Sequence, residues 1–103
     1  MKVVHCKKEK HDVYIGRPTK WGNPFSIGKD GTREEVISKY EEWLLGAREA
    51  PDGKAPPSIE DAKKELTGKV LGCWCAPKAC HGDILIKFVN REIMENLNEK
   101  DSK

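Results

Sequence analysis

The stretch KVLGCWCAPKACHGD, residues 69–83, decides the fold. It starts as an apolar run and ends where an amphipathic run begins, so it predicts a strand, a tight loop and the start of a helix. Its last eleven residues hold three of the four cysteines, a histidine and an aspartate. Open α/β folds place their ligands where a strand passes into a helix. The stretch therefore predicts an α/β fold and a functional site at the same place.

Flanking patterns predict the remaining elements. The strands are expected at residues 3–6, 13–15 and 69–75. Helices are expected at residues 33–47, where Thr32 and Glu35 form a capping box, and at residues 58–66, where Ser58 is the start signal. A last helix is expected from about residues 79–82 to the last apolar position at Leu97. This order predicts a small single-domain α/β fold of two or three layers, Rossmann-like, with a short and partly parallel sheet. The domain is expected to span residues 1–98, followed by a frayed tail at 99–103.

Composition narrows the classes of function. The 103 residues carry a net charge of +2, which gives no strong electrostatic argument for nucleic-acid binding and does not exclude a local basic site. No apolar run approaches the roughly 18 to 20 residues of a membrane span, and the N-terminus lacks the apolar core of a signal peptide. We therefore expect no membrane association and a cytoplasmic location. Thiols stay reduced there, which favours metal-binding or catalytic cysteines over disulfides.

The cysteine-rich stretch has two functional interpretations. Cys73, Cys75, Cys80 and His81 are a candidate tetrahedral set for zinc. The spacing is unusual for zinc, because neighbouring side chains on a helix diverge by about 100° and Cys80 adjoins His81. Both can reach one ion only if the chain bends sharply at this point.

The second interpretation is a metal-free active site made of Cys75, Cys80, His81 and Asp83. A helix N-terminus there would favour a bound anion through the backbone at Gly82, and it would also favour a reactive thiolate. A purely structural role stays open as well, because buried cysteine behaves as a small hydrophobic residue.

A second region, YIGRPTKWGNPF at residues 14–25, has the composition of a ligand-binding loop. Cations suit a phosphate, aromatic rings suit a flat base, and an amide can read the edge of a base. The predicted substrate-binding residues are Arg17, Lys20, Trp21, Asn23 and Phe25, together with Gly82. The alternative is a rigid turn whose aromatic rings fill the core. There is no glycine-rich dinucleotide motif and no Walker motif, so a standard phosphate cradle is not expected.

Two sequence boxes carry a resemblance to a known family: WGNPF at residues 21–25, and CWC with CHGD at residues 73–75 and 80–83. Together they resemble the family called domain of unknown function 4326, which occurs in bacteria, archaea and their viruses. The resemblance spans about residues 3–90. It implies no particular activity, because the family has none that could be transferred.

Three functional hypotheses follow from these patterns. The first is an enzyme, a hydrolase or transferase based on cysteine and histidine, that acts on a nucleotide, nucleoside or modified base. Its cleft would lie between the loop Arg17–Phe25 and the segment Cys73–Asp83. The second is a zinc-stabilised, non-catalytic module that binds nucleic acid or a protein partner, and the third is a metal-free ligand sensor. Neither the substrate nor the oligomeric state can be predicted from the sequence.

Overall fold

The computed structural model describes residues 1–74, 78 and 80–90. In chain order its elements are β1 (Lys2–His5), β2 (Val13–Tyr14), α1 (Arg33–Leu44), α2 (Ile59–Leu66), β3 (Val70–Cys73) and α3 (His81–Val89). Cys75, the tail at 99–103 and the expected extension of the last helix to Leu97 lie outside the described residues. None of the described helices is long and apolar enough to cross a membrane.

The three strands form one parallel sheet with the order β1-β3-β2. The register pairs Val3 of β1 with Leu71, and Tyr14 of β2 with Gly72. The Ile15 N–H continues the second ladder by donating to the Gly72 carbonyl at 2.9 Å. The predicted α/β class is confirmed, whereas the likeness to a Rossmann fold stays a prediction.

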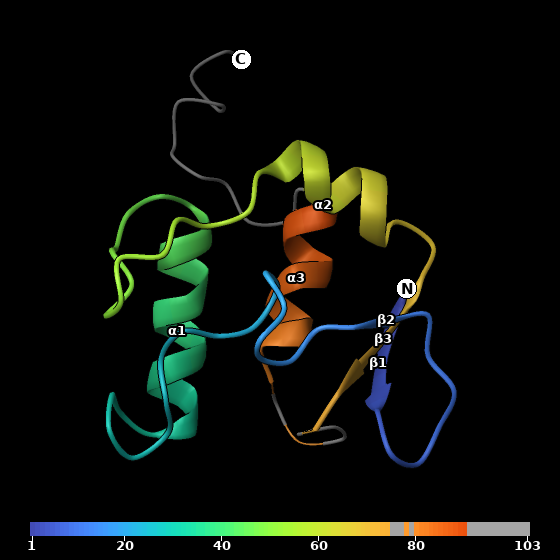
Figure 1. The fold of residues 1–103 in the computed structure, drawn as a ribbon, viewed down its shortest axis with the longest axis horizontal. Helices are drawn as coiled ribbons and strands as arrows, with labels where there is room; N and C mark the ends of the chain where they lie inside the picture. Colours follow the sequence, from blue (N-terminus) through green and yellow to red (C-terminus); the bar gives the residue numbers. More distant parts are fainter. Residues whose placement is uncertain (75–77, 79, 91–103) are drawn as a thin grey trace.

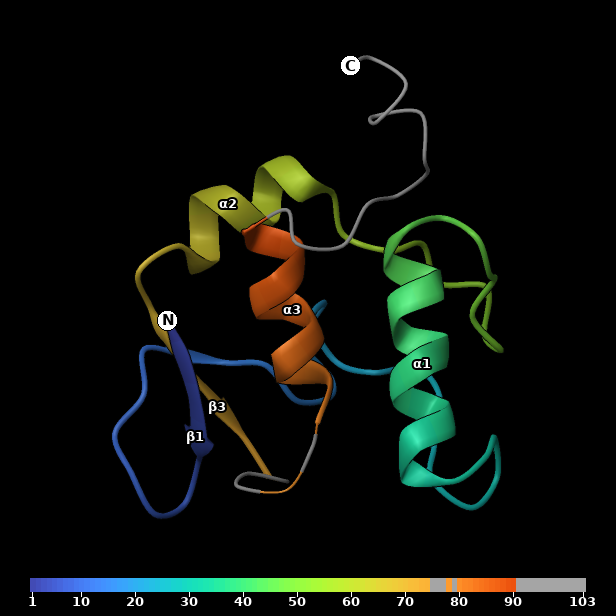
Figure 2. The ribbon, with the colours of Figure 1, turned by 180° about the vertical axis from the view of Figure 1, so that it is seen from behind.

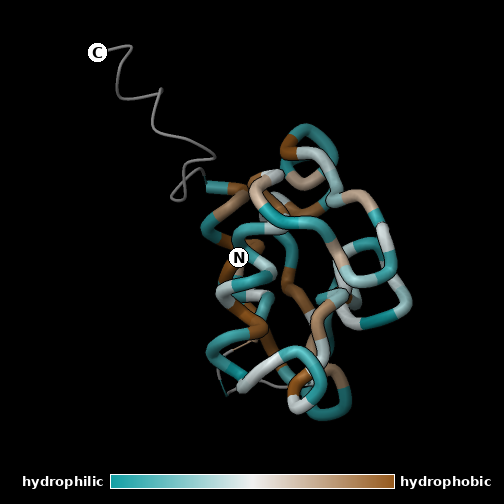
Figure 3. The backbone as a smooth tube through the Cα atoms, turned by 90° about the vertical axis from the view of Figure 1, so that its left-hand side faces the viewer, coloured by the Kyte–Doolittle hydropathy of each residue, from teal (hydrophilic) through white to brown (hydrophobic). Residues whose placement is uncertain are grey.

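Helix α3 lies at the centre of the molecule. It contacts α1, α2 and β1. Figures 1 and 2, seen from opposite sides, both place it between the sheet and α1. Its Leu85 and Phe88 side chains are buried, because apolar residues at helical spacing form its inner face. In Figure 3 the hydrophobic stretches run mainly through the interior and the peripheral loops are largely hydrophilic. The start of α3 is therefore held against the sheet by core packing.

Helix α1 begins as predicted and ends earlier than predicted. Thr32 Oγ accepts from the Glu35 N–H at 3.2 Å, and the Glu35 carboxylate accepts from the Thr32 N–H at 2.8 Å, so the capping box is confirmed. The helix stops at Leu44 instead of residue 47. Gly46 takes φ +82 there and donates to the Trp43 carbonyl, which closes the helix in the left-handed conformation that glycine favours.

Thr32→Ala should lower the free energy of unfolding by about 1 kcal/mol, because the first turn of α1 loses a capping acceptor. Ser38→Ala is the matched control, since Ser38 is exposed within the same helix and should change stability by less than about 0.5 kcal/mol. Urea denaturation measures both. Equal losses in the two variants would show that the capping box does not stabilise α1.

Candidate functional site

Two thiols and an imidazole meet where β3 ends and α3 begins. Cys73 is the last residue of β3, Cys80 is the N-cap of α3, and His81 is its first residue. One ligand atom from each lies within 4.8 Å of the others, and the two sulfurs are 2.9 Å apart. All three residues are buried. The sharp bend that Cys80 and His81 needed is supplied by the extended backbone of Cys80, at φ −153 and ψ 170, immediately before the helix.

The His81 ring is held in one orientation by the end of the sheet. Its Nε2 lies 2.8 Å from the Ile15 carbonyl oxygen. A carbonyl only accepts, so Nε2 carries a proton, and in the neutral ring Nδ1 holds the free lone pair. The Tyr40 ring contacts the imidazole edge to face, with the ring centroids 5.0 Å apart.

The environment of His81 favours its neutral form. Burial is the main cause that lowers the pKa of His81, and the Arg17 cation lowers it further. The hydrogen bond to Ile15 and the Asp83 charge act in the opposite direction and are outweighed. At neutral pH the ring is therefore uncharged, which is the state in which imidazole ligates a metal.

Cys80 caps α3 with its sulfur. Its Sγ accepts from the Gly82 N–H at 3.2 Å, while the Asp83 carboxylate accepts from the Cys80 N–H at 3.2 Å. The interaction with the Cys73 thiol, and then burial, raise the pKa of Cys80 well above its usual range, and the Gly82 N–H only partly offsets this. Two buried sulfurs at this distance cannot both be anions unless a cation lies beside them.

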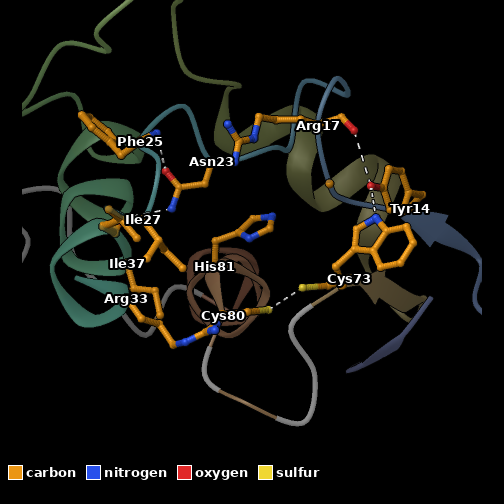
Figure 4. Close-up of a pocket in the computed structure, with 13 residues that line it drawn as sticks. Tyr14, Arg17, Asn23, Phe25, Ile27, Arg33, Ile37, Cys73, Cys80 and His81 are labelled. Carbon is orange, nitrogen blue, oxygen red and sulfur yellow. Dashed lines mark hydrogen bonds between the residues drawn. The ribbon is translucent and has the colours of Figure 1, made fainter. Parts of the chain in front are cut away.

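One cavity of about 310 Å³ opens onto this cluster (Figure 4). Its walls come from the end of β2, the loop that follows β2, helix α1 and the start of α3. The residues that line it are Tyr14, Gly16, Arg17, Asn23, Phe25, Ile27, Arg33, Val36, Ile37, Cys73, Trp74, Cys80 and His81. Figure 4 shows the His81 ring between Asn23 and the Cys73–Cys80 pair. The structure thus brings six of the predicted site residues to one cavity: Arg17, Asn23, Phe25, Cys73, Cys80 and His81.

Lys20 and Trp21 face away from the cavity. The Trp21 ring is buried in the core, and its backbone carbonyl accepts from the Tyr40 hydroxyl at 2.6 Å. The Lys20 ammonium pairs with Glu65 at 2.7 Å and with Asp61 at 3.7 Å, both on α2. Neither residue is among those that line the cavity. Lys20 has its counterions on α2, and Trp21 packs as the rigid-turn interpretation expected.

Asn23 and Phe25 line the cavity while also fixing its wall. The Asn23 amide nitrogen donates to the Val36 carbonyl at 3.1 Å, and its oxygen accepts from the Phe25 N–H at 2.9 Å. The first bond ties the loop to α1, and the second fixes the turn of the loop itself. Asn23 therefore shapes the cavity through its own amide, with both ends of that amide already bonded.

Gly82 and Asp83, two further predicted site residues, have structural contacts at the start of α3. Gly82 packs α3 onto the sheet, since a Cβ there would lie 2.8 Å from Val3 Cγ2 and 2.9 Å from Ile15 Cδ1. Its N–H is bonded to Cys80, so this helix start does not offer it to an anion. Asp83 is exposed and acts as the reciprocal cap of α3. Cys75 lies outside the described residues.

Sequence reasoning missed three polar or aromatic residues of the cavity. Tyr14, Trp74 and Arg33 line the cavity but were not among the predicted site residues. The signal that could have found Tyr14 and Trp74 is their position at the carboxyl ends of two predicted strands. Parallel strands end at the same edge of a sheet, so a parallel sheet places these two side chains at one edge.

The fold and the cluster define a class: a small parallel-sheet α/β domain with a Cys/His cluster at the carboxyl edge of its sheet. The chain belongs to the family described as "Domain of unknown function (DUF4326)", whose model matches residues 3–91. The resemblance carried by the two sequence boxes is thereby confirmed.

Two viral proteins are similar to the chain. One is the "Uncharacterized 12.4 kDa protein in nrdA-td intergenic region" of Enterobacteria phage T4, 39% identical over 97% of this chain and 87% of its own length. The other is "Uncharacterized protein R718" of Acanthamoeba polyphaga mimivirus, 30% identical over 84% of this chain and 77% of its own length. No solved structure gives a significant match.

Gly82→Ala should destabilise the protein by roughly 1–3 kcal/mol, because the added methyl group meets Val3 and Ile15 at the helix–sheet contact. The double variant with Val3→Ala should lose less than the sum of the two single changes, since Val3 is the nearest obstacle. Thermal and urea unfolding measure this coupling. Strictly additive losses would mean that Gly82 does not set the approach of α3 to β1.

Proposed function

We propose that the protein is a small enzyme that binds a nucleotide, nucleoside or modified base in the cavity, with the Cys73–Cys80–His81 cluster as its reactive floor. One observation carries this proposal: a single cavity is lined both by the loop that bears Arg17 and by the cluster. A ligand held by the loop would therefore lie in the same cavity as the sulfur and imidazole groups.

Charge in the cavity favours an anionic ligand. Arg17 and Arg33 line it, and no carboxylate is among the described residues that do so. The Arg17 guanidinium donates to Ser26 Oγ at 3.1 Å and forms no ion pair within the described part of the chain. Because this partner is neutral, it does not compensate the charge of the guanidinium, which can still pair with a phosphate.

The size and surface of the cavity suit a small ligand. Its volume of about 310 Å³ falls at the lower end of the range of roughly 300–1,000 Å³ that ligand pockets occupy. Phe25 and Trp74 give it aromatic surface, and Ile27 and Ile37 give it aliphatic surface. Apolar walls with a few charged groups are the usual make-up of such pockets.

For the chemistry at the floor we favour a zinc ion over a free thiolate nucleophile. Zinc would neutralise the Cys73 and Cys80 sulfurs together, and His81 would ligate through Nδ1. The Nε2–H bond to the Ile15 carbonyl is the outer contact that commonly orients a metal-bound histidine. The described residues offer three ligands, so a fourth position would be open to water or a ligand oxygen unless Cys75, which lies outside them, fills it. Zinc held there would supply Lewis acidity.

A metal-free nucleophile is less well supported. A thiol attacks as its thiolate. The raised pKa of Cys80 keeps it protonated at neutral pH when no cation is present. His81 is also a weak base for deprotonating Cys80, because burial lowers the pKa of its ring. A reduced cytoplasmic setting, which we also propose, would keep both cysteines in the thiol state from which they can bind metal.

The second candidate function is a zinc-stabilised module that binds nucleic acid or a protein partner without catalysis. The burial of Cys73 and Cys80, at 1% and 3% exposure, favours it, because structural zinc sites are closed. The two candidates differ in how far folding depends on the metal. A structural zinc contributes much of the folding energy of a small domain.

Protein purified under reducing conditions should contain about one zinc per chain, and Cys80→Ser or His81→Asn should weaken zinc binding at least tenfold. Cys6→Ser is the control, because Cys6 is not in the cluster of described ligands and should bind zinc normally. Plasma mass spectrometry and competition with a chromophoric chelator give content and affinity. Unaltered zinc binding by the cluster variants would refute the site.

Chelator treatment of the same zinc-containing protein distinguishes the enzyme from the zinc-stabilised module. If the zinc serves catalysis, removing it with chelator should lower the melting temperature by only a few degrees. Unfolding of the protein on removal would favour the structural module.

Arg17→Gln should weaken the binding of nucleoside monophosphates about tenfold or more, the effect of losing a charge-assisted hydrogen bond to phosphate. Lys20→Gln is the charge-matched control, because Lys20 pairs with α2 and does not line the cavity; its affinity should stay within about twofold. Calorimetric titration with ribo- and deoxyribonucleoside 5′-monophosphates measures both. Failure of the wild-type protein to bind any of them would sink the nucleotide proposal.

A further inference from the structure

Trp74 is a large aromatic side chain left in contact with solvent. Its exposure is 55%, whereas Trp21 and Trp43 are buried at 3% and 0%. Trp74 directly follows the metal-site cysteine Cys73 at the end of β3, and it lines the same cavity. An exposed indole in this position either has no function or forms a wall of the ligand site.

Three contacts hold the Trp74 ring in place. Its Nε1–H donates to the Tyr14 hydroxyl at 2.8 Å. The His5 ring meets it edge to face, with the centroids 5.7 Å apart and the planes at 80°. The Lys7 ammonium lies 5.5 Å from the ring centroid. An exposed side chain without a function would be expected to keep more rotamer freedom, so this ring is pre-organised.

The contacts also connect the ring to the phosphate-binding side of the cavity. The Tyr14 hydroxyl that accepts from Trp74 in turn lies 3.4 Å from the Arg17 carbonyl, to which it donates (Figure 4). Tyr14 can occupy this place because residue 16 is glycine, where a Cβ would lie 2.3 Å from the Tyr14 hydroxyl. Trp74, Tyr14 and Arg17 thus form one continuous edge of the cavity.

We infer that Trp74 is the stacking platform for the base of the bound nucleotide, with the phosphate directed to Arg17. This inference rests on the proposed function and adds a recognition residue to it. Stacking on indole is tolerant of sequence, because every base has a flat π-face. Lys7 adds positive charge beside the ring, which suits an anionic ligand. The buried Trp21 cannot take this role without opening the core.

The decisive experiment compares ligands with and without a base. Calorimetric titrations use nucleoside 5′-monophosphates and ribose 5-phosphate against wild type, Trp74→Ala and Trp74→Phe. Trp74→Ala should weaken nucleotide binding roughly 5- to 150-fold, the range for losing one base–aromatic stack, and leave ribose 5-phosphate binding unchanged. Trp74→Phe, which keeps an aromatic face, should stay within a few-fold of wild type.

Fluorescence gives an independent readout. The chain has three tryptophans, and two are buried, so quenching by iodide and by bound nucleotide should come from Trp74 and should disappear in Trp74→Phe. Trp74→Leu replaces Trp74→Ala if the latter does not fold, since leucine keeps apolar volume and lacks a π-face.

The outcomes separate the two proposals. Nucleotide binding that Arg17→Gln weakens and Trp74→Ala or Trp74→Leu leaves intact would overturn the platform while the proposed function stands. Equal weakening of ribose 5-phosphate and nucleotides in the alanine and leucine variants would also overturn it, because the effect would then not involve the base. If no nucleotide binds to the wild type, the proposed function fails and the platform fails with it.

Discussion

The hydrogen bond between His81 and the Ile15 carbonyl is the contact on which the rest of the site depends. It joins the first residue of α3 to the chain just after β2, 66 residues earlier. It fixes which ring nitrogen carries the proton, so Nδ1 of the neutral ring keeps its lone pair. The contact exists because Gly82 lets α3 approach Val3 and Ile15 closely. A larger residue at this position would separate the helix from the sheet and widen the cluster.

The site combines two opposite electrostatic environments within a few side chains. At the floor, two sulfurs lie 2.9 Å apart and require a cation if both are to be ionised. At the walls, Arg17 and Arg33 favour an anion. A metal ion bound by the two sulfurs and a phosphate bound by the arginines would satisfy both environments. Trp74 contributes a flat aromatic surface at the edge, so under the proposed function the base as well as the phosphate of a nucleotide would have a partner.

Local signals in the sequence were sufficient for the order of the described helices and strands, and three residues of the predicted cysteine-rich site, Cys73, Cys80 and His81, do lie together. Thr32 and Glu35 marked the start of α1, and the alternation up to Cys73 marked β3, because both patterns depend on near neighbours. Contacts between distant residues could not be predicted. Lys20 was read as a ligand residue because Glu65, its partner, lies 45 residues away.

The same limit applies to two tryptophans: Trp21, a predicted binding residue, is buried, whereas Trp74 is exposed and lines the cavity. Trp21 and Trp74 differ in burial because of what packs over them, which composition does not encode.

An open zinc site at the floor of the cavity is the central claim, and it is tested most directly by X-ray absorption at the zinc edge of the zinc-loaded protein. It predicts two sulfur neighbours at about 2.3 Å and nitrogen or oxygen neighbours at about 2.0–2.1 Å. A first shell without sulfur, or one closed by a third sulfur, would contradict it.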